Sequence, residues 1–146
     1  MEEIAVVYAR SLFEAALDQD KLDVVRDQLG EFADALSETR ELQVFFFSPY
    51  FSTQEKEDGL DRAVSGADPT IVNFLKLLIE NHRMPAIFRI RRGYDRRWEA
   101  HNRLLPVEVT SAVELDEQTV RGIGDRILDA SIANRLESLR KQVARS

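Results

Sequence analysis

The apolar positions of this chain repeat at helical spacing over most of its length. Ile4, Tyr8, Leu12 and Ala15 follow one another at intervals of four, four and three residues, which is typical of one apolar stripe along an α-helix. Similar stripes recur further along, separated by proline, glycine and capping residues. They predict helices at residues 3–17, 22–36, 41–47, 52–65, 69–81, 85–105, 116–127 and 128–143.

Residues 107–113 break this helical pattern. Val107, Val109 and Val113 fall on one side of a period-two pattern, which predicts a half-buried β-strand, and Pro106 ends the helix before it. A lone strand cannot satisfy its own backbone N–H and C=O groups. We therefore expect a mainly α protein, with a helical bundle at residues 1–105 and a small α+β domain at residues 106–146 whose remaining strands are absent from the sequence.

Two helix starts carry specific capping signals. Ser52 precedes Glu55 by three residues, the spacing of a capping box in which each side chain bonds the backbone N–H of the other. Asp68 is followed by Pro69, which combines a capping carboxylate with proline at the first helical position. Both signals predict helices that begin sharply.

The composition excludes several classes of protein. The 146 residues are 44% hydrophobic and 32% charged, which is ordinary for one globular unit or a small domain plus a fragment. The absence of cysteine excludes disulfides and thiol chemistry. No apolar run approaches the roughly 20 residues of a membrane-spanning helix, and the acidic N-terminus lacks the basic start of a secretory signal. We expect an intracellular protein.

Charge is spread unevenly along the chain. Residues 1–80 hold 7 Lys/Arg against 17 Asp/Glu, whereas residues 81–105 hold 7 Arg against 2 acidic residues. Nucleic acids favour a broadly positive surface, so an acidic body with one short basic segment indicates protein partners instead.

The sequence supplies no convincing catalytic or metal site. Gly122 and Gly124 lack the strand and lysine of a phosphate-binding loop. The two histidines, His82 and His101, lie too far apart in the sequence to share a helical turn as metal ligands. The many carboxylates cluster at helix starts, where they favour the helix dipole. We expect no catalytic residues, no metal and no cofactor.

The basic segment between Arg89 and Arg97 is the main alternative. Arginines interleaved with aromatic residues can bind nucleic acid through phosphate contacts and base stacking. On a helix, however, Ile90, Tyr94 and Trp98 share one face while the arginines occupy the others. That arrangement is typical of a core-facing stripe with a solvated basic face, and nucleic-acid binding is kept as the alternative function.

Recognition of a partner helix is the remaining possibility. An apolar groove between two helices can bind an amphipathic helix from another protein. The first helix and the helix containing Ile71 and Ile79 have the widest apolar faces, so they are the best candidates for the walls of such a groove. The competing interpretation, that the bundle core consumes both faces, is equally compatible with the pattern.

Several segments resemble, in order, those of one protein family. They are residues 8–16, 47–49 with Lys56, 73–83, 107–112 with Leu115, and 128–132 leading to 134–136. Each segment is weak by itself, but the ordered set is specific. The chain resembles the delta subunit of bacterial F-type ATP synthase, whose mitochondrial relative is the oligomycin-sensitivity-conferring protein.

The resemblance implies an N-terminal six-helix bundle, a small C-terminal domain and no catalytic activity. Such a subunit connects the catalytic head to the peripheral stalk at the cytoplasmic face of the bacterial membrane and holds the head against rotor torque during proton-driven ATP synthesis. The bundle would receive the N-terminal helix of an alpha subunit, and the last helix would contact the b subunits of the stalk. The implied groove residues are Tyr8, Ser11, Leu12, Ala15, Asn73, Leu77 and Asn81, and the implied stalk residues are Ile132, Leu136 and Leu139.

One departure from the family pattern lies between Ile127 and Leu128. The family has two further strands and a Gly-Gly turn there, whereas here the two residues are adjacent. Either the protein carries a deletion, or the sequence omits residues. The intact patterns on both sides favour an omission, and an intact mass near 16.8 kDa would contradict it.

Overall fold

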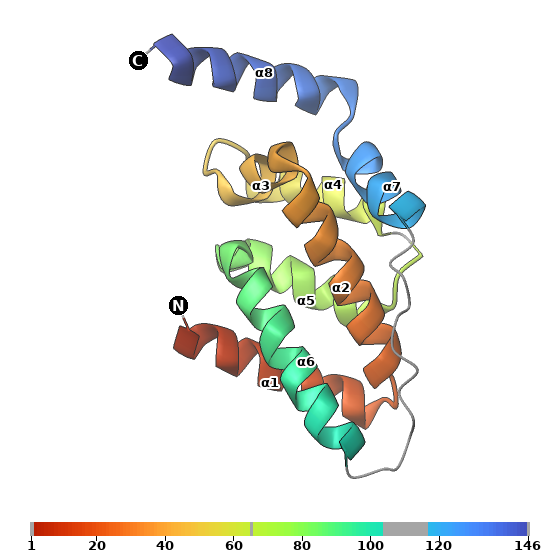
Figure 1. The fold of residues 1–146 in the computed structure, drawn as a ribbon. Helices are drawn as coiled ribbons and strands as arrows, with labels where there is room; N and C mark the ends of the chain where they lie inside the picture. The colour runs from red at the N-terminus through yellow and green to blue at the C-terminus, as the bar shows by residue number, and fades with distance from the viewer. Residues whose placement is uncertain (1, 65, 104–116, 146) are drawn as a thin grey trace.

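The chain folds into an assembly of helices, as the apolar periodicity predicts. The computed structural model describes residues 2–64, 66–103 and 117–145 (Figure 1). The helices are α1 (Glu2–Asp18), α2 (Leu22–Glu38), α3 (Arg40–Phe47), α4 (Thr53–Ala63), α5 (Pro69–Glu80), a 3-10 turn η1 (Met84–Ala86), α6 (Ile87–Arg103), α7 (Glu117–Ile127) and α8 (Ala130–Arg145). The mainly α prediction is confirmed.

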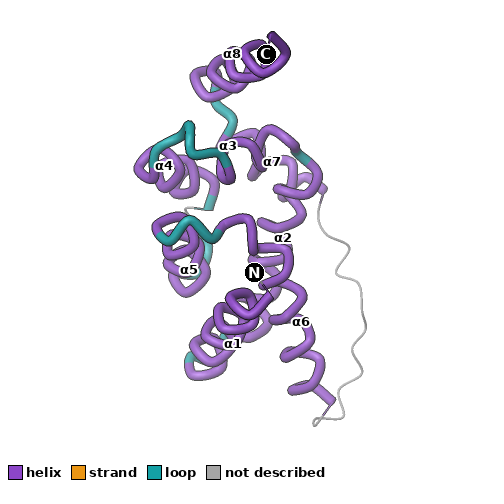
Figure 2. Tube along the Cα trace, turned by 90° about the vertical axis from the view of Figure 1, so that its left-hand side faces the viewer, coloured by secondary structure: helices purple, strands orange, loops and turns teal. Residues whose placement is uncertain are grey.

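The expected α+β domain stays a prediction. The residues that the structure describes contain no strand (Figure 2). The strand predicted at residues 107–113 lies outside them. The chain passes directly from α7 into α8 through Leu128, whose backbone N–H donates to the carbonyl of Gly124 at 2.9 Å.

Both capping predictions are confirmed. The backbone N–H of Glu55 donates to Ser52 Oγ at 3.1 Å, and that of Ser52 donates to Glu55 Oε2 at 3.0 Å, which completes the capping box of α4. The Asp68 carboxylate accepts from the backbone N–H of Thr70 at 2.9 Å at the start of α5. The start of α6 differs slightly from the prediction, because Pro85 lies in η1 and α6 begins at Ile87.

The buried face of α1 differs from the stripe predicted by its large apolar residues. The residues in the core are Ala5, Ala9, Leu12 and Ala16, whereas Ile4, Tyr8 and Ala15 are only half-buried. The reason is the close approach of α1 to α6: a Cβ atom on Gly93 would lie 3.0 Å from the Cβ of Ala9. Small side chains let the two helices approach closely. A face made mostly of alanine is hard to recognise as a core face from the hydrophobic pattern of the sequence. Larger apolar groups of α1 are thereby left near the surface.

Helix α7 packs on the same core as the helices before residue 104. Val120, Ile123 and Ile127 are buried, and α7 contacts both α2 and α4. Helix α8 lies across α3 at one end of the assembly (Figure 1). The predicted boundary near residue 105 and a separate six-helix unit therefore stay predictions.

Candidate functional site

Helices α1 and α5 form an antiparallel seam whose register is fixed at both ends. Asn81 Nδ2 donates to the Tyr8 hydroxyl at 3.0 Å, which joins the end of α5 to the start of α1. Thr70 Oγ1 donates to Gln19 Oε1 at 3.1 Å and joins the opposite ends. Between them, the Tyr8 ring meets Phe74 edge to face, with centroids 6.1 Å apart. The residues between these contacts therefore face one another across the seam.

On the α1 side of the seam, half-buried and exposed residues lie over one buried residue, Leu12. Tyr8 and Ala15 are half-buried and Ser11 is exposed, and spacings of three and four residues place all three on one side of α1. Leu12 is different, because only 2% of its surface is exposed and it belongs to the core. Leu12 therefore supports the wall from beneath and offers a partner almost no surface.

The α5 wall presents one large apolar residue between polar ones. Asn73, Leu77 and Asn81 follow one another at intervals of four and are all exposed, with Leu77 at 42%. On α1, Val7 lies four residues before Ser11 and is 50% exposed. Val7 and Leu77 thus expose apolar surface near the end of the seam that the Tyr8–Asn81 hydrogen bond joins. We call this surface, formed by Val7, Tyr8, Ser11, Ala15, Asn73, Leu77 and Asn81, the α1–α5 groove.

Sequence reasoning missed three contributors to this groove. The Gln19–Thr70 hydrogen bond joins the two helices at its far end, and Phe74 packs beneath it against the Tyr8 ring. The Gln19–Thr70 hydrogen bond joins residues far apart in the sequence, and no local pattern indicates it. Phe74 belongs to the apolar stripe of α5, so periodicity identifies it as a core residue but gives it no role in a site.

The aromatic residues of α6 are engaged within the protein. Tyr94 donates from its hydroxyl to the backbone carbonyl of Leu22 at 2.7 Å, and Trp98 Nε1 donates to Asp23 Oδ1 at 2.7 Å. The Arg26 guanidinium lies 3.9 Å from the Trp98 ring centroid. Ile90, Tyr94 and Trp98 are buried as their shared face predicts. These rings are not available for base stacking, so the structure provides no support for nucleic-acid binding by this helix.

The residues implied for stalk binding lie on the face of α8 that packs against α3. Ile132 and Leu136 are each 7% exposed, and Leu139 is half-buried. Leu136 and Leu139 also line a cleft of about 580 Å³ between α8 and α3, together with Arg40 and Val44. The packing of α8 thus buries Ile132 and Leu136, and the cleft lies beside Leu136 and Leu139.

An ion pair holds α8 to the start of α4. Arg135 Nη1 lies 2.6 Å from Glu55 Oε1, and the Arg135 guanidinium lies 4.8 Å from the Phe51 ring centroid. The hydrogen bond from Arg135, together with the backbone N–H of Ser52, lowers the pKa of Glu55. The capping carboxylate of α4 therefore also positions α8.

The part of the chain that the structure describes has neither a metal-binding cluster nor a membrane-spanning helix. Within residues 2–64, 66–103 and 117–145 there is no group of three or more His, Asp or Glu side chains placed to hold a metal ion. His101 packs its ring against Phe13, with centroids 6.0 Å apart. In the same part of the chain, no helix has the length and apolar character needed to cross a bilayer.

Comparison with known proteins identifies the family. Residues 4–123 match the family model described as ATP synthase delta (OSCP) subunit. ATP synthase subunit delta of Rubrobacter xylanophilus is 33% identical over 165 aligned positions, which cover 92% of each chain. ATP synthase subunit 5, mitochondrial, of Schizosaccharomyces pombe is 27% identical over 92% of this chain and 78% of its own.

The aligned length differs from the length of this chain. The Rubrobacter alignment spans 165 positions, more than the 146 residues of this chain, so the relative has residues that this chain lacks. No solved structure matches the chain significantly. The family match covers most of the residues that build the α1–α5 groove and its supporting core. The chain belongs to the ATP synthase delta (OSCP) subunit family.

Proposed function

We propose that this chain is a non-catalytic connector of F-type ATP synthase. It links the N-terminal helix of an alpha subunit in the catalytic head to the b subunits of the peripheral stalk. By doing so it holds the head against rotor torque during proton-driven ATP synthesis. Family membership supports a structural role in the synthase. The exposed apolar residues Val7 and Leu77 beside the joined α1 and α5 are the observation that carries the head-binding part of the proposal.

The groove fits an amphipathic helix. Leu77 and Val7 offer apolar contacts, while Asn73, Asn81 and Ser11 offer hydrogen bonds at the rim. A partner helix with apolar residues at i, i+3, i+4 and i+7 would bury these apolar groups and leave its polar face to solvent. Because residues 1–80 are strongly acidic, the partner's flanking residues should be basic or neutral.

The stalk contact is assigned to the other end of the assembly. The cleft between α3 and α8 includes Leu139 and two arginines, Arg40 and Arg140, at a distance from the groove along the long axis of the molecule (Figure 1). Two separate contacts used together resist dissociation better than either contact used alone. The connector would sit peripherally at the cytoplasmic face of the bacterial cell membrane as part of the synthase.

Substitution of Leu77 tests the head-binding proposal. Full burial of a leucine contributes about 1.5–3 kcal/mol, so covering the exposed part of Leu77 contributes roughly 1 kcal/mol. An aspartate there would add the cost of desolvating a charge. We therefore expect Leu77→Asp to weaken binding of an alpha N-terminal peptide by about tenfold or more in calorimetry.

The control is Val24→Asp. Val24 is also an exposed apolar residue, on α2 outside the groove, and its substitution should leave the affinity unchanged. Leu12 is unsuitable for this test because a charge there would disrupt the core. Equal peptide binding by wild-type protein and the Leu77→Asp variant would refute head binding through this groove.

A further inference from the structure

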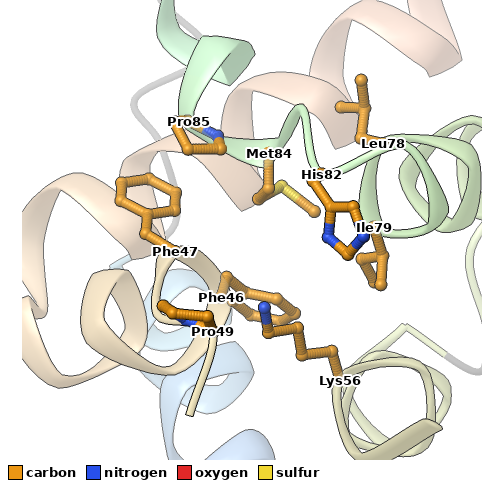
Figure 3. Close-up of a pocket in the computed structure, with 9 residues that line it drawn as sticks. All are labelled: Phe46, Phe47, Pro49, Lys56, Leu78, Ile79, His82, Met84 and Pro85. Atoms are coloured by element: carbon orange, nitrogen blue, oxygen red, sulfur yellow. The ribbon is translucent and has the colours of Figure 1, made fainter. Parts of the chain in front are cut away.

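A second cavity lies on the buried side of α5. It has a volume of about 190 Å³ and is formed where α3, α4 and the end of α5 meet η1 (Figure 3). Its walls are mostly apolar, with Phe46, Phe47, Ile79 and Met84 among them, and its two ionisable residues are Lys56 and His82. Pro49, His82 and Pro85 are exposed and open the cavity to solvent, and its volume is enough for a group about the size of one aromatic ring.

Lys56 is the unusual member of this cavity. Only 7% of its surface is exposed, and it makes no hydrogen bond or ion pair with the residues that the structure describes. Figure 3 shows its side chain crossing the cavity floor, with the nitrogen beside Phe46 and Pro49. Burial lowers the pKa of the Lys56 ammonium, because its charged form loses hydration without gaining a counter-charge. The ammonium thus reaches little solvent and has no protein partner among the described residues, which leaves it able to pair with an anion in the cavity.

The acidic residues nearest to Lys56 in the sequence interact with other side chains. Glu55 pairs with Arg135, and Asp61 pairs with Lys76 at 2.9 Å. Asp58 accepts a hydrogen bond from Gln54 at 2.8 Å. Burial, and after it the contact with Glu80, raises the pKa of Glu57. The positive charge of Lys56 therefore has no compensating carboxylate on its own helix.

His82 adds a second polar group on the opposite side. Its imidazole faces the cavity across from Lys56 (Figure 3). The residue lies just beyond the end of α5 with a left-handed φ of 56°, a position that glycine usually occupies. The N–H group of the ring can donate a hydrogen bond to an anion held by Lys56.

We propose that this cavity binds a small apolar carboxylate, such as an aromatic monocarboxylate or a short fatty acid. Its carboxylate pairs with the Lys56 ammonium and accepts a hydrogen bond from His82, while its hydrocarbon part lies among Phe46, Ile79 and Met84. Charge complementarity selects the anion, and the cavity volume limits the ligand to about one ring or a short chain. This site is separate from the α1–α5 groove and does not depend on the proposed connector role.

Benzoate is the probe for this proposal. In an NMR titration of the full chain, benzoate should give saturable shifts at the Met84 and Ile79 methyl groups. Toluene, which has the same ring without the carboxylate, should bind at least tenfold more weakly. Lys56→Met should reduce benzoate affinity at least tenfold, whereas Lys76→Met, which removes a lysine paired on the surface with Asp61, should not change it.

Lys56→Met is expected to fold, because it replaces a largely buried lysine that has no ion-pair partner in the described part of the chain with an apolar side chain of similar length. Absence of saturable shifts with benzoate at about 10 mM, enough to fill most of a site with a Kd of ~1 mM, would overturn the proposal. Equal benzoate affinity of the Lys56→Met variant would also overturn it. A third result would overturn it as well: Lys56 is protected from reductive methylation in the assembled synthase, and the isolated chain does not bind benzoate. In that case a carboxylate of a partner protein, and not a small ligand, would occupy the cavity.

Discussion

Substitution of Gly93 tests the close packing of α1 on α6, on which the groove depends. Gly93→Ala gains about 1 kcal/mol from helix propensity. The added Cβ would lie 3.0 Å from the Cβ of Ala9, and such overpacking costs about 1–3 kcal/mol. We therefore expect a net change between zero and about 2 kcal/mol of destabilisation.

Two further variants make the result interpretable. Gly122 in α7 has open space where its Cβ would lie, so Gly122→Ala should stabilise the protein by about 1 kcal/mol. The double variant Ala9→Gly with Gly93→Ala removes a methyl group from α1 and adds one to α6 at the same contact. The steric cost of Gly93→Ala should therefore be relieved, and the changes in the free energy of unfolding should not be additive.

Urea unfolding followed by circular dichroism measures these differences. With a slope of about 1–3 kcal/mol per molar urea, a change of 1 kcal/mol shifts the midpoint by roughly 0.3–1 M. If Gly93→Ala stabilises the protein as much as Gly122→Ala does, α1 does not approach α6 closely and this account of the groove is wrong.

Three further predictions concern other contacts. His82→Gly should raise the free energy of unfolding by about 1 kcal/mol by removing a non-glycine residue from left-handed backbone, and an unchanged urea midpoint would contradict this. The lowered pKa of Glu55 means that its stabilising contact with Arg135 is fully present above the ordinary value of 4.5 and is lost as the pH falls through the lower folded value. The protection factors of amides in α8, corrected for the intrinsic exchange rate at each pH, should therefore fall in acid, and Arg135→Met should remove that pH dependence. Trp98→Phe should cost about 1 kcal/mol through loss of the hydrogen bond to Asp23, and a similar cost in an Asp23→Ala background would refute the coupling.

Local chemistry explains which helices could be predicted. The capping box at Ser52 and the Asp68–Pro69 start depend only on neighbouring residues, so the sequence predicts them accurately. The shared face of Ile90, Tyr94 and Trp98 follows from helical spacing alone. These features need no knowledge of distant contacts.

The buried face of α1 could not be predicted in the same way. Large apolar residues dominate a hydrophobic pattern, yet three of the four core residues of α1 are alanines, Ala5, Ala9 and Ala16, and only Leu12 is large. The deciding factor is Gly93, which lies on another helix far along the chain. Because small residues face each other, Tyr8 is displaced toward the α1–α5 groove.

The predicted groove residues therefore have different roles. Tyr8 and Asn81 are joined by a hydrogen bond, and Leu77 is exposed between polar neighbours. Leu12 lies in the core beneath them. Helical spacing identifies which residues share a side of α1 but not how deeply each is buried, since burial depends on the helices packed against it. The groove's role in binding a partner stays a prediction.

Cross-linking in the assembled synthase tests the central claim most directly. The chain contains no cysteine, so Ser11→Cys and Asn73→Cys each place a single thiol on one wall of the groove, and Ser37→Cys on α2 is the control. With a short thiol-directed photo-cross-linker, both groove variants should join to the alpha subunit, and the control should not. Absence of alpha cross-links from both walls, or equal cross-linking from Ser37→Cys, would contradict the proposal that the groove holds the catalytic head.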